Sequence, residues 1–492
     1  MASLNEIKET RLLKLENLKN AGMNPYDFNV TRDYKLEEVI SNFNSIKKSF
    51  SVVGRVMAVR GQGAILFVVL NDGTSELQTV FKKDILGEEK ISLFVDNIDM
   101  GDFIQITGDT FVTQRGANSI LVSDWKILTK SLAPLPEKWA GLQDTEEKYR
   151  KRYLDILSDP ETFQRFKKRG EIIKYVRKFF DEKGFLEIET PILQTQAGGA
   201  MAKTFNTHHN DYDMDMVMRI SLEIEHKMLM VGGFNGVYEI GKNFRNEGSD
   251  PTHIQEFTMI EWYAAYVSLE ENMNWTEKLL RGLAEDVLGK STFTVFDKSD
   301  NPVEVDFSKK WERVNFADLL KENASLDMFT AELPEIQKKA KEFGMEEKEV
   351  SKIGKANLLD FIYKKSSRNN IIHPTFVMNY PTDLKPLAAQ NGDGTANMCQ
   401  LIIAGAEITN QYQELVDPIA QRSLLENQSK AKDAGDEEAM SLNEEFITAM
   451  EHGMPPMTGF GMGIDRLVAI LTEQKNLRDT IFFPIMRPRG KE

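Results

Sequence analysis

Residues 237–257 read VYEIGKNFRNEGSDPTHIQEF, and this stretch offers two different places for a nucleotide. With the preceding Gly236, its first part nearly matches a phosphate-binding P-loop that ends in Lys242. A P-loop, however, needs a glycine-rich loop followed by Ser or Thr, whereas strand-forming residues and Asn243 stand here. We therefore expect a strand over this part and no P-loop.

The second part predicts a hairpin whose two strands are joined by a polar loop. Arg245 ends the first strand, and Phe257 begins the returning strand. The Arg245 fork suits a phosphate, Glu247 suits an adenine amino group, and Phe257 suits stacking on a purine ring. An ion pair on an exposed hairpin explains the same residues, so this stretch alone leaves both interpretations open.

Residues 459–467, GFGMGIDRL, place glycines at every second position of a predicted strand. Glycines on one strand face allow a ligand or another backbone to approach closely. Arg466 follows in the first turn of a predicted helix, where the helix N-terminus favours anions. A closely packed strand without a ligand is the alternative.

The stretch EITNQYQELVD, residues 407–417, carries acidic groups beside an aromatic ring. In an extended strand four polar residues nearly share one face, with a break in the period of two before Asn410. Such a group suits a magnesium–phosphate complex or an organic cation, and a solvated strand face is the alternative. The four residues are Glu407, Asn410, Tyr412 and Glu414.

Two other pairs of polar residues receive different predictions. Glu261 and Tyr263 lie in the apolar run FTMIEWY, residues 257–263, which predicts that they are buried. The adjacent His208 and His209 point to opposite faces of a strand and have no third ligand nearby. We therefore expect a structural role for the two histidines and no metal site.

Composition limits the class of protein. The 492 residues suffice for two or three domains, and 61 Lys and Arg against 76 Asp and Glu give a net charge of −15. This balance excludes a basic field over the whole surface, so a nucleic-acid face must be local. The single cysteine, Cys399, excludes a disulfide framework and a multi-cysteine zinc site. The first 20 residues lack the apolar core of a signal peptide, and no apolar run is long enough to span a membrane, so we expect a cytoplasmic protein.

The distribution of residue types along the chain predicts its organisation. Five short β-branched runs between residues 50 and 130 predict a small closed barrel. Residues 129–144 contain two prolines and no clear period, as in a linker. Ser158 and Glu161 form a predicted capping box at the start of a helix that should end near Gly184. Residues 290–370 are expected to be helical.

Three stretches, taken in order, resemble the three signature motifs of class II aminoacyl-tRNA synthetases. They are FLEIETP at 185–191, FRNE…HIQEF at 244–257 and GFGMGIDRL at 459–467. The stretches GGAMAKTFNTHHN, RISLEIEHK and EITNQYQELVDP are similar to the lysyl-specific branch of that class, and the likeness extends over nearly the whole chain.

The resemblance implies an α+β protein in which an OB-fold barrel precedes a class II catalytic domain, an antiparallel sheet flanked by helices. The implied parts are an N-terminal helical extension (1–49), an OB-fold anticodon-binding domain (50–130), a linker (131–157) and the catalytic domain (158–492), with a helical insertion around 280–370. It also implies a homodimer that assembles through the first motif, with no DNA or membrane partner.

The implied activity is that of a lysine–tRNA ligase. ATP and L-lysine form lysyl-adenylate and pyrophosphate, and the lysyl group is then transferred to the 3′ end of a lysine-accepting tRNA. Mg²⁺ is the implied cofactor. Positioning and charge neutralisation would carry the reaction without a covalent enzyme nucleophile.

The resemblance also assigns roles to individual residues. Arg245 and Arg466 are the implied catalytic residues, on the α-phosphate and the γ-phosphate. ATP would be bound by Arg245, Glu247, His253, Phe257, Glu407 and Arg466. Lysine would be bound by Gly199, Glu223, Arg245, Glu261, Tyr263, Asn410, Tyr412 and Glu414. The implied metal ligands are Glu407, Glu414 and Gln400, and the anticodon-binding residues are Arg60, Phe67 and Gln78.

The chain departs from the family pattern at two places. Gln400 stands where the family usually has a second glutamate ligand for magnesium, so one negative charge is missing. Lys203 and Thr204 replace an Arg-Pro pair, which removes a bidentate fork.

Three alternative functions predict other residues or domains. An aspartyl- or asparaginyl-specific relative should present a cation to its substrate, whereas the extra pocket residues here are acidic. An enzyme that attaches lysine to a protein would lack the barrel. A tRNA-binding module without catalysis would not need Arg245, Glu247 and Arg466.

Overall fold

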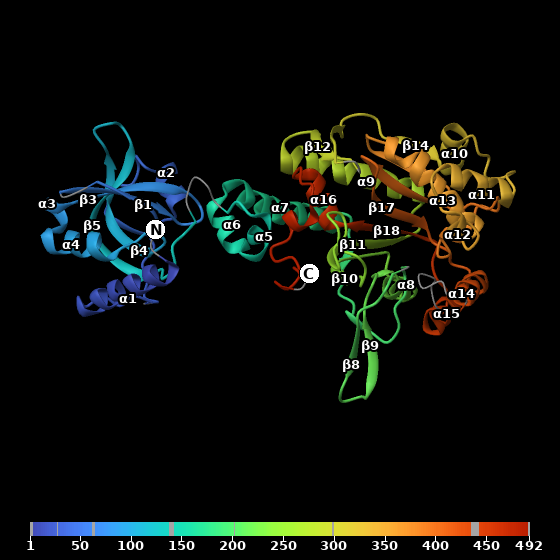
Figure 1. Cartoon of the computed structure of the whole chain (residues 1–492), viewed down its shortest axis with the longest axis horizontal. Coiled ribbons are helices and arrows are strands. Elements are labelled where there is room, and N and C mark those ends of the chain that lie inside the picture. Colours follow the sequence, from blue (N-terminus) through green and yellow to red (C-terminus); the bar gives the residue numbers. More distant parts are fainter. Residues whose placement is uncertain are drawn as a thin grey trace. The chain divides into compact units, whose positions relative to one another are not determined.

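The structure, a computed structural model, describes residues 3–26, 28–61, 64–136, 142–200, 202–297, 300–433 and 442–490. The chain divides into two compact units, Met1–Gln143 and Asp144–Glu492 (Figure 1). In the part of the chain that is described, every helix is too short or too polar to cross a lipid bilayer.

The first unit contains the predicted barrel, which is confirmed as a closed sheet in the order β1-β2-β3-β5-β4. Helices α1 and α2 pack on it through Leu18, Leu36 and Val39, which belong to the same apolar core as the strands. The elements are α1 (Leu4–Asn20), α2 (Leu36–Ser41), β1 (Phe50–Arg60), β2 (Ile65–Asn71), β3 (Glu76–Lys82), α3 (Lys83–Leu86), α4 (Glu88–Asn97), β4 (Phe103–Val112) and β5 (Asn118–Thr129).

Strand β2 alternates between the interior and the outer face of the barrel. Leu66 and Val68 are buried in the core, whereas Phe67 between them is half-buried and lies outside it. Arg60 of β1 is the direct cross-strand partner of Phe67, so both side chains lie on the same face. Gln78 of β3 pairs with Val69, the next outward residue of β2, and donates to Ser119 Oγ at 2.9 Å. The three expected anticodon-binding residues therefore share the outer face of the barrel.

The second unit is built on an eight-stranded sheet in the order β14-β15-β16-β17-β18-β11-β10-β6. Only its two outermost pairs, β14–β15 and β10–β6, are parallel. The strands are β6 (Leu186–Glu187), β10 (Gly236–Phe244), β11 (Glu256–Ala265), β14 (Glu312–Asn315), β15 (Thr375–Met378), β16 (Met398–Ile403), β17 (Ala406–Gln413) and β18 (Met457–Gly463). Two small sheets, β7 (Leu193–Gln194) with β9 (Met214–Met218) and β8 (Asn206–His209), and β12 (Thr292–Phe296) with β13 (Pro302–Asp306), complete the unit.

Helices flank the large sheet, as predicted (Figure 1). The helices are α5 (Thr145–Arg150), α6 (Arg152–Ser158), α7 (Pro160–Asp181), α8 (Glu223–Val231), α9 (Leu269–Gly282) continuing as a π-helix (Leu283–Leu288), α10 (Phe316–Ala324), α11 (Leu333–Glu342), α12 (Glu347–Val350), α13 (Lys355–Ser366), α14 (Pro418–Asp433), α15 (Glu444–Glu451) and α16 (Ile464–Leu471), with 3-10 turns at Arg368–Asn370, Thr382–Leu384 and Leu477–Thr480. Helices α10 to α13 gather near the β14 edge of the sheet, and the β8–β9 hairpin projects away from it (Figure 1). The region 290–370 is not purely helical, because it also contains β12, β13 and β14.

The two faces of the large sheet have different characters. On one face Ile260, Trp262 and Phe460 join the main apolar core with α7, α9 and α16. The buried Trp262 indole donates to Asn272 Oδ1 at 3.0 Å, which satisfies its one polar group within that core. On the opposite face Glu239, Glu261 and Tyr263 lie beside Gly459 and Gly461, so the centre of this face is polar and lacks bulky side chains, and a ligand can lie there.

The start of α7 differs from the prediction. Asp159, not Ser158, caps the helix, and its side chain accepts from the backbone N–H of Glu161. Ser158 is the last residue of α6, and its hydroxyl donates to Leu154 O at 2.8 Å. The predicted N-cap residue was therefore wrong by one position, because the short helix α6 ends immediately before α7.

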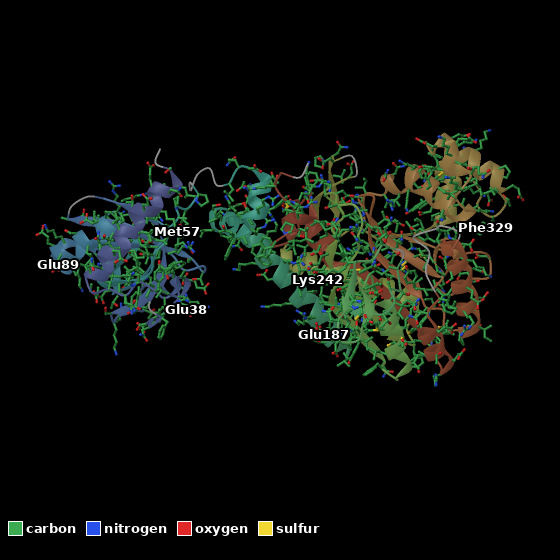
Figure 2. All side chains as sticks on the ribbon, turned by 60° about the horizontal axis from the view of Figure 1, so that its bottom comes forward. Glu38, Met57, Glu89, Glu187, Lys242 and Phe329 are labelled. Carbon is green, nitrogen blue, oxygen red and sulfur yellow. The ribbon has the colours of Figure 1, made fainter. Side chains whose placement is uncertain are left out.

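The P-loop look-alike is confirmed as a strand, because residues 236–244 form β10 in a continuous antiparallel ladder with β11. Lys242, labelled in Figure 2, lies 3.3 Å from Glu256 on the neighbouring strand. Its ammonium is therefore part of a cross-strand ion pair and not of a phosphate-binding loop.

Candidate functional site

The floor of the site is strand β18, whose glycines leave the polar face of the sheet open. Gly461 pairs with Glu261 on one side and with Asn410 on the other, and Gly459 pairs likewise with Tyr263 and Tyr412. A Cβ on Gly459 would lie 2.0 Å from Glu414 Oε1 and 2.6 Å from the Tyr263 ring. Glycine is therefore required at this position, because the Glu414 carboxylate occupies the space of a side chain.

A bulge in β17 explains why Asn410 broke the period of the predicted strand face. Leu401 pairs with Thr409 and Ile402 pairs with Glu407, so Ile408 is the extra residue. The bulge turns Glu407 to the same face as Asn410, whose side-chain amide donates to the Glu407 carboxylate. The predicted grouping of these residues is confirmed.

A chain of hydrogen bonds continues from Asn410 into the protein. The Gln400 amide donates to Asn410 Oδ1 at 2.8 Å, and the Gln400 carbonyl accepts from the Tyr380 hydroxyl at 2.8 Å. Burial raises the pKa of Tyr380 well above its usual value, so this hydroxyl stays protonated and able to donate. The Gln400 carbonyl is therefore directed at Tyr380, and only its amide group faces the site.

Three carboxylates lie buried beside the glycine floor. Glu223 opens helix α8, Glu261 lies on β11 and Glu414 follows β17, and all three are buried. Burial raises the pKa values of the Tyr263 and Tyr412 hydroxyls well above the usual value. The negative charges of the nearby carboxylates raise them further. Burial of this many acidic groups favours a cation as their ligand.

Among the described residues, Glu261 accepts hydrogen bonds only from neutral donors. Its Oε1 accepts from the Ser221 hydroxyl at 3.1 Å and from the Leu222 N–H at 3.2 Å, and the Tyr263 hydroxyl lies 3.4 Å from Oε2. Burial, and then the charge of Glu223, raises the pKa of Glu261 to about 7, although the two donors oppose the shift. The carboxyl is therefore half-protonated near neutral pH unless a cation binds it.

Gly199 lies against Glu223, and the loop that follows it reaches the β10–β11 loop. Gly199 adopts φ +77°, and a Cβ there would lie 2.8 Å from Glu223 Cβ and 3.0 Å from Ser221 Oγ. Farther along this loop, the Lys203 carbonyl accepts from Asn246 N at 2.9 Å, and the Thr204 carbonyl accepts from the Asn246 side-chain amide at 3.5 Å. The two residues that depart from the family pattern therefore contact the β10–β11 loop.

Two arginines lie on the same face as the carboxylates. Arg245 follows β10 and donates to Ile220 O at 3.4 Å, and Arg466 in the first turn of α16 donates to Glu407 O at 2.6 Å. Within the residues that the structure describes, neither guanidinium has a carboxylate within 4.0 Å. Burial lowers the pKa of both arginines, while nearby carboxylates such as Glu407 oppose the shift. Two partly buried cations without an ion pair suit an anionic ligand.

The predicted hairpin is confirmed, and it brings its aromatic and acidic residues to Arg245. The Arg245 guanidinium lies over the Phe257 ring, 5.2 Å from its centroid, and Arg245 N donates to Gln255 O at 2.8 Å. Glu247 is exposed in the loop, and its charge acts on Arg245. His253, also exposed, lies 2.8 Å from the Asp250 carboxylate.

Residue-by-residue reading of the sequence missed a buried polar cluster behind Glu261. Arg219 pairs with Glu239 at 2.8 Å, and Glu239 also accepts from Thr190 and lies 3.1 Å from His226 Nε2. Burial lowers the pKa of His226, so the ring is neutral at physiological pH. Arg219 and His226 lie in the stretch RISLEIEHK, from which only Glu223 was predicted to have a role, and Glu239 lies in β10.

Arg368 is a second residue that sequence reasoning missed. It begins the 3-10 turn Arg368–Asn370, which packs against Gly405 in the turn just before Glu407. Its positive charge contributes to the lowered pKa of Arg466. It lies in the charged region 290–370, where nothing in the residue pattern distinguishes one arginine from another.

The structural role predicted for His208 and His209 is consistent with their contacts. His208 Nδ1 lies 2.9 Å from Asp215 on the paired strand β9, and His209 stacks on Tyr212. In the described ranges, no three His, Cys, Asp or Glu side chains group closely enough to hold a metal ion.

The donor set fits a magnesium ion that is held mainly by phosphate oxygens. Such an ion needs only one or two protein carboxylates and keeps several waters. Glu407, half-buried beside Arg466, provides one. Glu414 Oε2 is 2.5 Å from Lys227 and its Oε1 lies over Gly459, while the Gln400 carbonyl is directed at Tyr380.

Comparisons with known proteins match both units. A family model described as tRNA synthetases class II (D, K and N) matches residues 144–487, and one described as OB-fold nucleic acid binding domain matches residues 50–128. The chain is 40% identical over 491 residues to a lysine–tRNA ligase of Carboxydothermus hydrogenoformans, which covers 99% of each chain. It is 40% identical over 492 residues to that of Clostridium perfringens (99% and 97% covered) and 42% identical over 463 residues to that of Aquifex aeolicus (93% and 76% covered).

The raised pKa of Glu261 makes stability depend on pH. The carboxyl ordinarily loses its proton near pH 4.5, but in the folded protein it keeps the proton up to about pH 7. Its contribution to the free energy of unfolding is therefore complete below pH 4.5 and is lost as the pH rises to about 7. A shift of this size corresponds to roughly 3 kcal/mol. Because Glu261→Gln stays neutral, its melting temperature should rise relative to wild type between pH 5 and pH 8.

The control for this prediction is Glu256→Gln, an exposed position on the same strand. Its melting temperature should follow that of wild type at every pH. Parallel curves for Glu261→Gln and wild type would show that folding does not raise the pKa of Glu261.

Proposed function

We propose that this chain, which belongs to the class II tRNA synthetases and within them to the lysine–tRNA ligases, joins L-lysine to its tRNA in two steps. A lysine carboxylate oxygen attacks the α-phosphorus of ATP, and pyrophosphate leaves. The 3′-terminal ribose hydroxyl of the tRNA then attacks the carbonyl carbon of lysyl-adenylate, and AMP leaves. The observation that carries the proposal is a cluster of three buried carboxylates on the same sheet face as two arginines that have no ion pair among the described residues.

The pocket accounts for recognition of the amino acid. We assign Glu261, Tyr263 and Glu414 to the ε-ammonium, and Tyr412 to the aliphatic stem. The α-ammonium would meet Glu223 beside Gly199, whose missing side chain leaves that approach open. Asn410 and Arg245 would hold the carboxylate that reacts.

The arginines and the hairpin account for recognition of ATP. Adenine would stack on Phe257, and Glu247 would accept from its amino group. Arg245 would neutralise the α-phosphate as it is attacked, while Arg466 and His253 would bind the outer phosphates. No protein nucleophile is needed, because alignment of the two bound substrates and stabilisation of developing charge carry the reaction.

Magnesium is the proposed cofactor, held by Glu407 together with ATP phosphate oxygens. When bound, it would supply positive charge to the pyrophosphate that leaves. Gln400 would act through Asn410, because its amide holds Asn410 in the orientation that donates to Glu407.

The barrel and the exposed apolar residues support two partners. The outer face with Arg60, Phe67 and Gln78 offers a cation, an aromatic ring and an amide to the anticodon of the tRNA. Leu186 and Leu193 are exposed on either side of Pro191 in the first motif. Exposed apolar residues of this kind suit an interface between two copies of this chain. The proposed location of the protein is the cytoplasm.

The direct test of the proposal is ATP–pyrophosphate exchange with each of the twenty amino acids, followed by charging of tRNA. Lysine alone should support rapid exchange, and purified lysine-accepting tRNA should become charged. Faster exchange with aspartate or asparagine would assign the chain to another branch of class II, and no exchange with any amino acid would leave only a tRNA-binding role.

Arg245→Ala should abolish adenylate formation without unfolding the protein, because among the described residues the guanidinium donates hydrogen bonds only to Ile220 O and has no ion pair to lose. Loss of a desolvated charge contact costs about 3 to 5 kcal/mol, which is roughly a hundredfold or more in exchange rate. The matched control is Lys242→Ala, the lysine of the P-loop look-alike, which should keep its exchange activity. More than half the wild-type rate in Arg245→Ala would contradict the assignment.

Glu407→Gln should raise the magnesium concentration needed for half-maximal exchange by about tenfold, equivalent to about 1.4 kcal/mol. The amide keeps the volume but removes the charge that a hard cation prefers. Glu256→Gln, on an exposed strand end, serves as the control and should leave the titration unchanged. An unchanged titration in Glu407→Gln would remove this residue from the metal site.

Phe67→Ala should raise the Michaelis constant for tRNA by about tenfold, because stacking on one base contributes about 1 to 3 kcal/mol. Exchange without tRNA and the melting temperature should stay near the wild-type values, since Phe67 lies outside the barrel core. The control is the neighbouring core residue in Leu66→Ala, which should lower the melting temperature. A comparable loss of stability in Phe67→Ala would identify it as a core residue.

A further inference from the structure

A fourth charged residue in the amino-acid pocket has no place in the proposed function. The side chain of Lys227, on helix α8, is completely buried. Its Nζ lies 2.6 Å from Glu223 Oε1, one helical turn earlier, and 2.5 Å from Glu414 Oε2, which follows β17. One ammonium therefore bridges two of the three pocket carboxylates.

The third carboxylate has no such partner. Across the ranges that the structure describes, no Lys or Arg nitrogen lies within 4.0 Å of Glu261. Glu414 Oε1, the oxygen not used by Lys227, is buried without a hydrogen-bond partner and lies over Gly459. The pocket therefore keeps acceptor oxygens for a further cation after Lys227 has been satisfied.

The number of charged groups shows how much positive charge a ligand must bring. Three buried carboxylates face one buried ammonium, so the cluster is deficient in positive charge. Free lysine brings two ammonium groups, and together with Lys227 these equal the three carboxylates in number. Without Lys227, one carboxylate would stay buried and unpaired even in the complex, which is strongly unfavourable.

We propose that Lys227 is a specificity-determining residue, a built-in alkylammonium that fixes Glu223 and Glu414 and sets the pocket to accept a ligand with two ammonium groups. This inference rests on the proposed function, because it concerns the same amino-acid pocket. Lys227 acts through the two glutamates and does not itself take part in the reaction. Its side chain has the same four methylenes and ammonium as the ligand's.

The test uses the full-length protein with Lys227→Ala, which removes the ammonium and leaves room for a small amine. The Michaelis constant for lysine in ATP–pyrophosphate exchange should rise by about a hundredfold, while kcat changes much less. Low concentrations of propylammonium should lower this Michaelis constant again, because the amine restores the missing charge. Propanol, similar in size but neutral, should not.

Two comparisons make the test specific to charge. In wild type, propylammonium can only compete with lysine, so it should raise the Michaelis constant for lysine. In Lys227→Ala the same amine should lower that constant. In Lys227→Met, methionine fills the volume without charge, so lysine should bind as weakly as in Lys227→Ala and propylammonium should give no recovery.

Defined results would overturn the inference. They are a folded Lys227→Ala protein with a lysine Michaelis constant within about threefold of wild type, and recovery that is equal with propanol and propylammonium. If Lys227→Ala does not fold, Lys227→Met is compared with Lys227→Met/Glu414→Gln. The double variant should melt at a higher temperature because it has one fewer unpaired buried carboxylate, and no gain would overturn the inference.

The failure of this inference can be distinguished from failure of the proposed function. If wild-type exchange does not depend on lysine, the proposed function is wrong. If wild-type exchange depends on lysine and Lys227→Ala behaves like wild type, only the role of Lys227 is wrong.

Discussion

The missing side chains of β18 are the constraint on which the site depends. Gly459 lies between two tyrosines of neighbouring strands, and Gly461 lies between Glu261 and Asn410. A methyl group at Gly459 would collide with the Glu414 carboxylate, so the pocket and the glycine pattern require each other. The opposite face of the same strand packs Phe460 and Met462 into the main core, which fixes the floor in place.

Burial gives the charges on this floor their selectivity. Carboxylates and guanidinium groups that have lost water bind partners of opposite charge far more strongly than exposed ones do, and they are costly when left unpaired. The raised pKa of Glu261 and the lowered pKa values of Arg245 and Arg466 have burial as their main cause. An amino acid with an ammonium at the end of its side chain would pair with the buried carboxylates, and its reactive carboxylate would pair with the arginines.

Much of this arrangement could be predicted from the sequence, because residue spacing along a strand determines its face. The barrel, the β10–β11 hairpin and the glycine strand were predicted on that basis, and the P-loop look-alike was rejected correctly. The bulge at Ile408 could not be predicted, since it depends on the register with β16, and it explains why Asn410 broke the expected period. The orientation of Gln400 also escaped prediction, because Tyr380 lies 20 residues away in sequence and meets it only across the folded sheet.

Lys227 shows the same limit most clearly. A lysine inside the stretch RISLEIEHK resembles any solvent-exposed helix residue until the fold buries it between Glu223 and Glu414. Its helix spacing predicts contact with Glu223, but its second partner comes from a strand end almost 190 residues later. Sequence patterns therefore identify the local half of such a cluster, and tertiary structure supplies the other half.

The central claim is that buried carboxylates select an ammonium side chain, and the most direct measurement compares L-lysine with L-norleucine. Norleucine has the four-carbon side chain without the charge, so it fills the slot but leaves the carboxylates without a partner. The ratio of kcat/KM values in ATP–pyrophosphate exchange should favour lysine by about a thousandfold or more. A norleucine value within about tenfold of the lysine value would contradict the account, because no charge-selective pocket would then exist.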